Sequence, residues 1–307
     1  MPSPMKGALA PVLTPLTPDF RPDAARLIAH CRWLLAQDCG LAVFGTNSEG
    51  NSLGVEEKIG LLERLVGEGL PPERMMPGTG TCSLRDTIAL SRRATELGCG
   101  GVLMLPPFYY KDVSDEGLYR YVSAVVDGVG DPSLRIYLYH IPPIAQVGFS
   151  LDLIERLITA YPGVVAGIKD SSGDWQNTRA MLERFPGWGV FCGNELRLLD
   201  AMKMGAAGVI SATCNINPST IAELCRNWND DGATQRHEKA VALRKTIQDF
   251  PQISALKAVV AHFRNDPEWR RLLPPLVELD TDQRTDLIER CRALGFEMQG
   301  IEAEAVA

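Results

Sequence analysis

The stretch "RIYLYHIPPIAQVGFSLDLIERLITAYPGVVAGIKD" (135–170) contains two short apolar runs joined by a longer amphipathic segment. The runs "RIYLYH" (135–140) and "VVAGIKD" (164–170) have the length and apolar character of buried strands. The segment 151–160 between them predicts a helix. A strand, a helix and a second strand in this order favour a parallel pair with a right-handed crossover.

The same alternation occurs eight times over roughly 220 residues. The predicted strands lie at 7–13, 41–45, 74–80, 101–106, 135–140, 164–170, 189–193 and 207–212. The predicted helices follow them at 23–37, 55–68, 84–97, 115–128, 151–160, 174–184, 195–203 and 217–228. Eight such units predict an α/β fold, a (β/α)8 TIM barrel. A doubly wound open sheet is disfavoured, since the first turn has no G-x-G-x-x-G sequence.

The remaining chain shows helical patterns only. These are "ATQRHEKAVALRKTIQDF" (233–250), "QISALKAVVAHFR" (252–264) and "TDQRTDLIERCRALGF" (281–296). We therefore expect a barrel over 1–230 and a C-terminal helical extension over 231–307, with three helices packed on the barrel. The last residues, 301–307, are expected to fray.

The composition of the chain limits the classes of binding partner and the cellular compartments that we expect. The net charge is −7 with no concentrated basic tract, which disfavours nucleic acid and anionic membranes as partners. No run approaches the roughly 18 apolar residues of a membrane-spanning helix. The eight cysteines form no C-x-x-C pair, and "MPSPMKGALAPVLTP" (1–15) lacks the pattern of a signal peptide. Reduced thiols and a cytoplasmic location are expected.

Barrel enzymes carry their chemistry at the carboxyl ends of the strands. Lys169 stands at such an end, although lysine is rarely buried. Val165, Gly167 and Lys169 alternate onto one strand face, and if that face is inward, Gly167 leaves space beneath the lysine. An apolar site favours a neutral amine, the form that attacks a carbonyl carbon. Alternatively, Lys169 reaches the rim or pairs with Asp170; position alone leaves both open.

Tyrosines follow two other predicted strands. Tyr139 ends "RIYLYH" and is a candidate proton relay, whereas Tyr137 is expected to pack inside the barrel. Tyr109 and Tyr110 lie in the loop that begins at Pro106, and one of them is expected to reach a pocket.

The loop "GTNSEG" (45–50) offers hydroxyl, amide and backbone N–H donors that can hold a carboxylate, with Gly45 forming a tight turn. A metal site is not expected, because the four histidines show neither H-x-H nor H-E-x-x-H spacing. A serine hydrolase is also disfavoured, because G-x-S-x-G is absent from the sequence.

Four motifs together resemble one enzyme family. They are "GTNSEGNSLGVEEK" (45–58), "PPFYYK" (106–111), "YHIPP" (139–143) and "GIKDSSGD" (167–174). In this order they are similar to the dihydrodipicolinate synthase / N-acetylneuraminate lyase family, over about residues 6–300. The resemblance implies a class I, Schiff-base-forming pyruvate aldolase or dehydratase on a (β/α)8 barrel. It also implies a homotetramer, a dimer of dimers, that needs neither metal nor organic cofactor.

The resemblance further implies the roles of three catalytic residues. Lys169 would form an imine with the 2-oxo carbon of pyruvate or another 2-oxo acid, the expected small-molecule partner. Tyr139 would be the general acid and base. Tyr109 would support this proton relay across a subunit interface.

For substrate binding, the resemblance implies that Thr46 and Asn47 hold the carboxylate and that Ile210 lines the pocket. Several positions depart from the family pattern, among them Ser48, Ala145 and Gln146. Asn47 replaces a threonine, which puts a hydroxyl relay in doubt, and His140 replaces an asparagine and is expected to be either a structural histidine or a polar group near the pocket. Ile144 stands where dihydrodipicolinate synthases carry an arginine that binds the second substrate's carboxylate.

The sequence thus predicts a lyase that cleaves or dehydrates a 2-oxo acid such as a 2-keto-3-deoxy sugar acid. Both reactions use the imine of Lys169 to stabilise a carbanion at C3, and aldol cleavage is favoured slightly. One alternative is dihydrodipicolinate synthase itself, which Ile144 disfavours. Another is a non-catalytic barrel that binds 2-oxo acids, which the presence of both Lys169 and Tyr139 disfavours.

Overall fold

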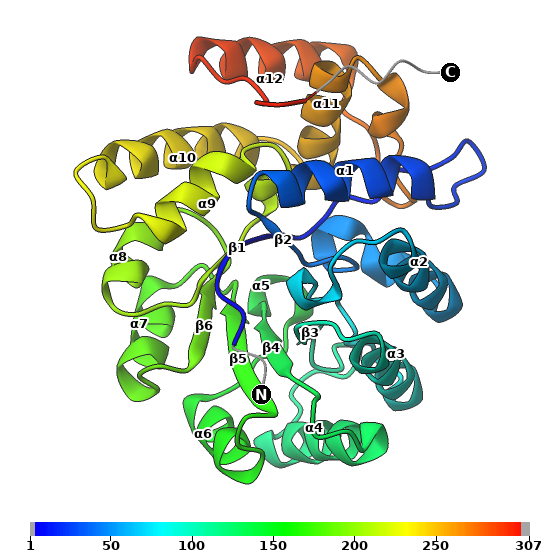
Figure 1. The fold of residues 1–307 in the computed structure, drawn as a ribbon, viewed down its shortest axis with the longest axis vertical. Coiled ribbons are helices and arrows are strands. Elements are labelled where there is room, and N and C mark those ends of the chain that lie inside the picture. The colour runs from blue at the N-terminus through cyan, green and yellow to red at the C-terminus, as the bar shows by residue number, and fades with distance from the viewer. Residues whose placement is uncertain (1–3, 302–307) are drawn as a thin grey trace.

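The strands form a parallel barrel sheet. The computed structural model describes residues 4–301, and within them seven strands lie in the order β2-β1-β7-β6-β5-β4-β3. Every neighbouring pair is parallel. The strands are β1 (Gly7–Ala10), β2 (Gly40–Leu41), β3 (Val102–Met104), β4 (Ile136–His140), β5 (Val165–Asp170), β6 (Gly189–Cys192) and β7 (Gly208–Ile210). Helices surround this sheet (Figure 1), and the predicted barrel is confirmed.

The segment 75–79 connects the two ends of this sheet. Met76 N donates to the Leu41 carbonyl at 2.7 Å, and Leu103 N donates to the Pro77 carbonyl at 2.8 Å. This segment therefore occupies the position of the strand predicted at 74–80. The prediction of a regular strand was wrong, because Pro77 has no N–H and cannot continue a ladder.

A helix follows each of these eight barrel segments, as predicted. They are α1 (Ala24–Ala36), α2 (Val55–Gly67), α3 (Leu84–Glu96), α4 (Asp115–Val129), α6 (Leu151–Ala160), α7 (Trp175–Arg184), α8 (Leu198–Lys203) and α9 (Pro218–Arg226). Serine side chains begin several of them; the Ser150 hydroxyl, for example, accepts a hydrogen bond from Leu153 N at 3.1 Å. The sequence analysis did not foresee α5 (Pro142–Ala145), a single turn after β4.

Strand alternation divides the apolar core in two. One cluster fills the space between strands and helices and includes Ile168 and Val190. The other fills the barrel interior and includes Leu9, Met76, Leu103, Tyr137, Tyr139, Phe191 and Ile210. The sheet therefore has side chains packed on both faces, as a parallel sheet requires.

The inward face of β5 differs from the expected one. Its pairing with β4 shifts register, so that Ile136 lies opposite Val165 but the next residue, Tyr137, lies opposite Gly167. Val165 consequently belongs to the outer cluster. The prediction that Val165 shares a face with Lys169 was wrong, because the irregularity breaks the two-residue period.

Gly167 leaves space for a tyrosine rather than for the lysine. A Cβ at Gly167 would lie 2.6 Å from Cδ1 of Tyr137 and 2.2 Å from the Gly189 carbonyl oxygen. The Tyr137 ring fills this layer of the interior, and its hydroxyl accepts a hydrogen bond from Met5 N at 2.9 Å. The expected interior packing of Tyr137 is confirmed.

The C-terminal extension contains the three expected helices, α10 (Ala233–Gln248), α11 (Gln252–Arg264) and α12 (Thr281–Ala293). Figure 1 shows α11 and α12 stacked beyond α1 and α10 at one side of the barrel. The boundary at residue 230 stays a prediction. Most of the end expected to fray, 302–307, lies outside the described residues.

A fully buried ion pair joins the extension to the barrel. Lys257 of α11 donates to Oε1 of Glu49, in the loop after β2, and both side chains are 0% exposed. Lys257 also donates to the Arg271 carbonyl at 2.7 Å, while Leu273 N donates to Oε2 of Glu49 at 2.6 Å. Burial lowers the pKa of Lys257, and the carboxylate of Glu49 opposes that shift. The extension therefore holds the loop 45–50 in place.

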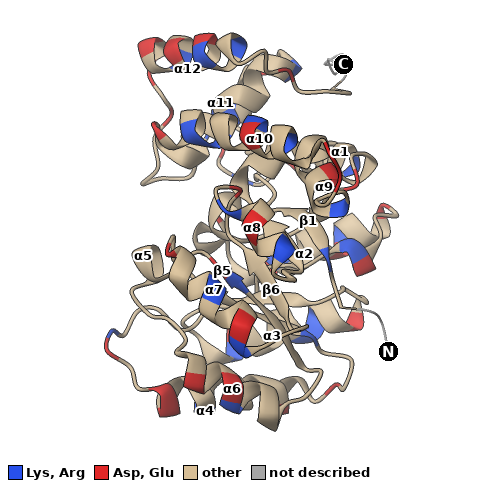
Figure 2. Cartoon of the chain, turned by 90° about the vertical axis from the view of Figure 1, so that its left-hand side faces the viewer, with Lys and Arg blue, Asp and Glu red and all other residues tan. Residues whose placement is uncertain are grey.

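The surface charges are mixed. In Figure 2, Lys and Arg are interspersed with Asp and Glu along the outer helices, including α12. Across the part of the chain that the structure describes, every helix is too short or too polar to span a bilayer.

The close contact at Gly167 predicts that Gly167→Ala destabilises the fold by about 2–3 kcal/mol or more, because neither the Tyr137 ring nor the Gly189 backbone can retreat inside the barrel. Urea unfolding measures this change. Gly60→Ala in α2, where a Cβ meets no atom within 4 Å, is the control and should stabilise by up to about 1 kcal/mol. Equal stabilities for the two variants would contradict the described packing.

The buried ion pair predicts that Lys257→Met destabilises by about 3–5 kcal/mol, because it leaves the Glu49 carboxylate buried without its partner. Exposed Lys245 on α10 supplies the control Lys245→Met, expected within about 0.5 kcal/mol of the wild type. Adding Glu49→Gln to Lys257→Met should recover part of the loss, since the uncompensated charge is removed. Strictly additive single and double variants in urea unfolding would show that the two groups are not coupled.

Candidate active site

Lys169 and Tyr139 lie side by side inside the barrel. Each is the next-to-last residue of its strand, β5 and β4, and the two pair directly in register. Lys169 is 3% exposed and Tyr139 is 2% exposed. Lys169 Nζ donates to the Tyr139 hydroxyl at 3.2 Å and lies 4.2 Å from the centre of the Tyr139 ring. The inward orientation of Lys169 is therefore confirmed.

Asp170 is not the partner of Lys169. Neighbouring residues of a strand point to opposite faces, and the Asp170 carboxylate accepts hydrogen bonds from Ser172 N at 2.9 Å and from the Thr178 hydroxyl at 2.6 Å. Asp170 thus orders the loop and first turns of α7. The alternative pairing of Lys169 with Asp170 was wrong, and the salt bridges found within 4–301 do not include Lys169.

A second hydroxyl, that of Thr46, extends this pair of side chains. Thr46 Oγ1 lies 3.3 Å from the Tyr139 hydroxyl, so Thr46, Tyr139 and Lys169 form a continuous hydrogen-bonded series. Asn47 in place of a threonine had put a hydroxyl relay in doubt. The neighbouring Thr46 places a threonine hydroxyl beside Tyr139, and a relay through it stays a prediction. A phenol between a hydroxyl and an amine can pass a proton in either direction.

The loop 45–50 begins its turn at Gly45 but takes its left-handed conformation at another residue. Gly45 has an extended conformation, φ −80° and ψ −168°. The left-handed residue is Glu49, with φ 56°, and a Cβ at Gly50 would lie 2.0 Å from the Phe44 carbonyl oxygen. The close approach at Gly50 therefore helps to shape the loop. The predicted tight turn at Gly45 is present, because the Gly45 carbonyl accepts hydrogen bonds from Ser48 N at 3.1 Å and from Gly50 N at 3.0 Å.

Between these positions, Thr46–Ser48 form one turn of 3₁₀ helix. The first N–H groups of such a turn have no partner inside the helix. The backbone at Thr46 and Asn47 is thus suited to binding an anionic group.

Asn47 is held by the C-terminal extension. Its side chain is 7% exposed, and Oδ1 accepts a hydrogen bond from Gln252 Nε2 at 2.7 Å. Gln252 begins α11, the helix that also carries Lys257. The sequence analysis missed Gln252, Glu49 and Lys257 as groups that position this loop. The sequence does contain an indication of the role of Lys257, because Lys257 is the single charged residue within the mainly apolar run "ISALKAVVA" (253–261).

The other predicted site residues lie at different depths. Ile210 ends β7, is 0% exposed and belongs to the interior cluster that contains Tyr139. Tyr109 is 74% exposed and packs edge-on against Tyr110, with ring centres 5.3 Å apart. The chain itself does not bring Tyr109 to Lys169, and its role across a subunit interface stays a prediction. Ile144 is 63% exposed in α5.

His140 has a structural contact. Its Nδ1 accepts a hydrogen bond from Phe149 N at 3.0 Å. Burial lowers the pKa of His140, which keeps the imidazole neutral and able to accept this bond. His140 precedes the turn α5, so the bond fixes the path of the chain from β4 to α6. The expectation of a hydrogen-bonded structural histidine is confirmed.

Metal ligands do not gather here. Across residues 4–301, His, Cys, Asp and Glu side chains form no group of three or more that could bind a metal ion. Independence from metals and organic cofactors stays a prediction.

Known proteins share this fold and much of this sequence. A lyase of Chloroflexus aurantiacus, described as uncharacterised and DapA-like, is 32% identical and covers 88% of this chain and 91% of its own. The putative 2-dehydro-3-deoxy-D-gluconate aldolase YagE of Escherichia coli is 28% identical over 92% of this chain and 94% of its own.

Solved structures of related proteins have the same fold as this chain. Dihydrodipicolinate synthase from Agrobacterium tumefaciens superposes with a TM-score of 0.88, at 32% identity over 94% of this chain and 99% of its own. YagE in complex with pyruvate superposes with a TM-score of 0.86, at 26% identity over 95% of this chain and 99% of its own. The predicted family and the predicted class of enzyme, a lyase, are confirmed. The sequence profile of the dihydrodipicolinate synthetase family matches residues 4–294, and the chain belongs to that family.

Proposed function

We propose that this protein is a Schiff-base lyase that cleaves a 2-oxo acid of the 2-keto-3-deoxy sugar acid type and releases pyruvate. The observation that carries the proposal is the buried amine of Lys169, 3.2 Å from the Tyr139 hydroxyl, at the carboxyl end of the barrel strands. An amine that forms an ion pair would be blocked as a nucleophile, whereas this one contacts a phenol that can exchange protons with it.

In the proposed reaction, Nζ of Lys169 attacks the 2-oxo carbon, and a proton reaches the oxygen of the resulting carbinolamine. Loss of water then gives the imine. Tyr139 is suited to carry these protons, because its hydroxyl already contacts Nζ and the Thr46 hydroxyl.

The imine then accepts electrons from the bond that breaks. Removal of the proton from the C4 hydroxyl cleaves C3–C4, releases an aldehyde and leaves an enamine on Lys169. Protonation at C3 and hydrolysis return pyruvate and the free amine. Dehydration begins from the same imine, by loss of a C3 proton and then of the C4 hydroxyl.

The loop 45–50 is the proposed carboxylate site. The N–H groups at Thr46 and Asn47 and the Thr46 hydroxyl provide donors beside Tyr139. Ile210 would form an apolar wall of the pocket. The pyruvate bound to YagE supports a 2-oxo acid as the ligand class, and the name of that relative favours an aldolase.

A second candidate is 4-hydroxy-tetrahydrodipicolinate synthase, because several relatives carry that name, including one from Bacillus subtilis at 29% identity. Ile144 opposes it, since an apolar side chain cannot bind the carboxylate of aspartate-semialdehyde. Assays of pyruvate release from 2-keto-3-deoxy acids, and of pyruvate consumption with aspartate-semialdehyde, distinguish the two. Consumption with aspartate-semialdehyde alone would reverse the preference.

Assembly and location complete the proposal. We propose a homotetramer in the cytoplasm, without metal or organic cofactor. The exposed rings of Tyr109 and Tyr110 support a subunit contact at that loop, and the eight free thiols support a reducing compartment.

Reduction with borohydride in the presence of pyruvate tests the proposed imine. We expect a stable pyruvate adduct on the wild-type protein and, after peptide mapping, on Lys169 alone. Lys169→Ala should give no adduct, whereas Lys257→Met should retain it wherever that variant is folded, because the amine of Lys257 is paired with Glu49. A folded wild-type protein without an adduct would favour a binding barrel that performs no chemistry.

The proposed proton relay predicts that Tyr139→Phe lowers kcat by about 10²-fold to 10⁴-fold while pyruvate still binds. Tyr137→Phe is the matched control. Tyr137 also lies inside the barrel, but its hydroxyl accepts a hydrogen bond from Met5 N and does not contact Lys169. Its kcat should stay near the wild-type value. Steady-state kinetics of pyruvate release measure both, and an equal loss in the two variants would indicate a packing effect rather than a relay.

A further inference from the structure

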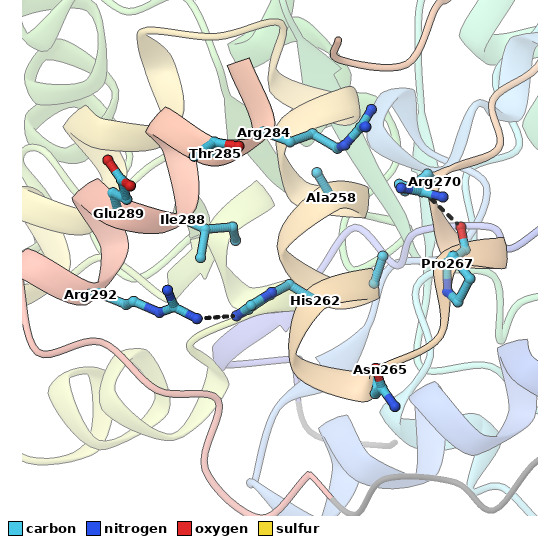
Figure 3. Close-up of a pocket in the computed structure, with 11 residues that line it drawn as sticks. Ala258, His262, Asn265, Pro267, Arg270, Arg284, Thr285, Ile288, Glu289 and Arg292 are labelled. Carbon is cyan, nitrogen blue, oxygen red and sulfur yellow. Dashed lines mark hydrogen bonds between the residues drawn. The ribbon is translucent and has the colours of Figure 1, made fainter. Parts of the chain in front are cut away.

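A cavity lies in the C-terminal extension, apart from Lys169 and Tyr139. Helix α11, helix α12 and the short turn η5 (Pro267–Arg270) line an open cavity of about 470 Å³ (Figure 3). Binding sites for small molecules commonly have volumes of about 300–1,000 Å³. Ala258 and Ala261 of α11 and Ile288 of α12 provide an apolar part of the wall. The cavity is therefore large enough for a small organic molecule.

The polar part of the wall is mainly cationic. Arg270, Arg284 and Arg292 line the cavity together with His262. Glu289 is the single acidic residue among the lining residues, and Figure 3 shows its carboxylate directed away from His262. Guanidinium groups bind carboxylates and phosphates through paired hydrogen bonds. The cavity wall thus has the chemistry of an oxyanion site.

Two of the cavity arginines, Arg284 and Arg292, take part in no ion pair found within residues 4–301. Arg270 differs, because its Nε lies 3.8 Å from a carboxylate oxygen of Glu278.

Arg290 forms ion pairs with Asp249 and Asp286. By contrast, Arg292 donates to a neutral acceptor, His262 Nε2, at 3.3 Å. Because a guanidinium has five N–H donors, this contact leaves others to bind a ligand.

Arg284 resembles Arg292 in this respect. It donates to the Leu279 carbonyl and to the Thr281 hydroxyl, which are also uncharged. Figure 3 shows Arg284 extending from α12 past Ala258, on the side of the cavity where Arg270 stands, whereas Arg292 lies beside His262 at the other side. Two cationic sides favour a ligand with more than one anionic group.

Helix α11 links this cavity to the loop 45–50. Ala258 lines the cavity, and the preceding residue, Lys257, forms the buried ion pair with Glu49. Arg270 lines the cavity too, and the carbonyl of the next residue, Arg271, accepts a hydrogen bond from Lys257 at 2.7 Å. A ligand that shifts α11 or η5 would therefore shift the groups that hold the proposed carboxylate site.

We propose that this cavity is an effector site for a small organic molecule bearing at least two carboxylate or phosphate groups, and that its occupancy changes pyruvate affinity through α11. The binding site stands on the cavity alone. The effect on pyruvate rests on the proposed function of Lys169.

Isothermal titration calorimetry with citrate, and separately with inorganic phosphate, at constant ionic strength tests the site. We expect saturable binding by the full chain for at least one anion, and the tighter of the two identifies the preferred group. Arg292→Gln and Arg284→Gln should each weaken anion binding by about tenfold or more, because each variant loses one charged contact with the anion. Arg290→Gln, which removes the same charge from α12 outside the cavity, should bind as the wild type does.

Two results would overturn the site. They are the absence of saturable binding by either anion, and an equal loss in Arg290→Gln, which would indicate nonspecific attraction. Arg292→Gln remains informative if Arg284→Gln fails to fold, because Arg292 is exposed and its side chain forms a hydrogen bond with His262 alone within residues 4–301.

Borohydride trapping tests the effector role. The pyruvate concentration that gives half-maximal trapping should change at least about threefold when the anion is saturating, in the wild type and Arg290→Gln but not in Arg292→Gln. Anion binding without this change would overturn the effector role. Failure of trapping at every pyruvate concentration would refute the proposed function of Lys169, whereas the calorimetry would still decide the site.

Discussion

The confinement of one amine beside one phenol is the constraint on which the proposed chemistry depends. Lys169 and Tyr139 occupy neighbouring positions in the register of two parallel strands, so the sheet itself sets their separation. The rings of Tyr137 on β4 and Phe191 on β6 fill the barrel interior and pack edge-on with centres 5.7 Å apart. The amine is thus held at the carboxyl end of the barrel by packing rather than by an opposite charge.

Two buried lysines illustrate how the partner determines the role of an amine. Lys257 and Lys169 are both removed from water, at 0% and 3% exposed. Lys257 faces the Glu49 carboxylate, and this pair joins α11 to the loop 45–50. Lys169 faces an uncharged hydroxyl, which leaves its amine free of an ion pair for the proposed imine. Lys257 therefore supports the loop that is proposed to bind the substrate carboxylate beside Lys169.

The barrel and the position of Lys169 could be predicted because both follow from local patterns: alternating strands and helices, and a lysine at the end of an apolar run. The irregular features of the barrel could not be predicted from local sequence patterns. The register shift that turns Val165 outward depends on the neighbouring strand, and Pro77 interrupts a run that otherwise has the character of a strand. Lys257 and Glu49 lie 208 positions apart, so no local pattern connects them.

A crystal structure of the protein soaked with pyruvate is the most direct measurement of the central claim. Continuous electron density should run from Nζ of Lys169 to the 2-oxo carbon, with the Tyr139 hydroxyl within hydrogen-bonding distance of the new bond and the carboxylate at the loop 45–50. Pyruvate bound without a covalent link, or bound away from Lys169 while that amine stays free, would contradict it.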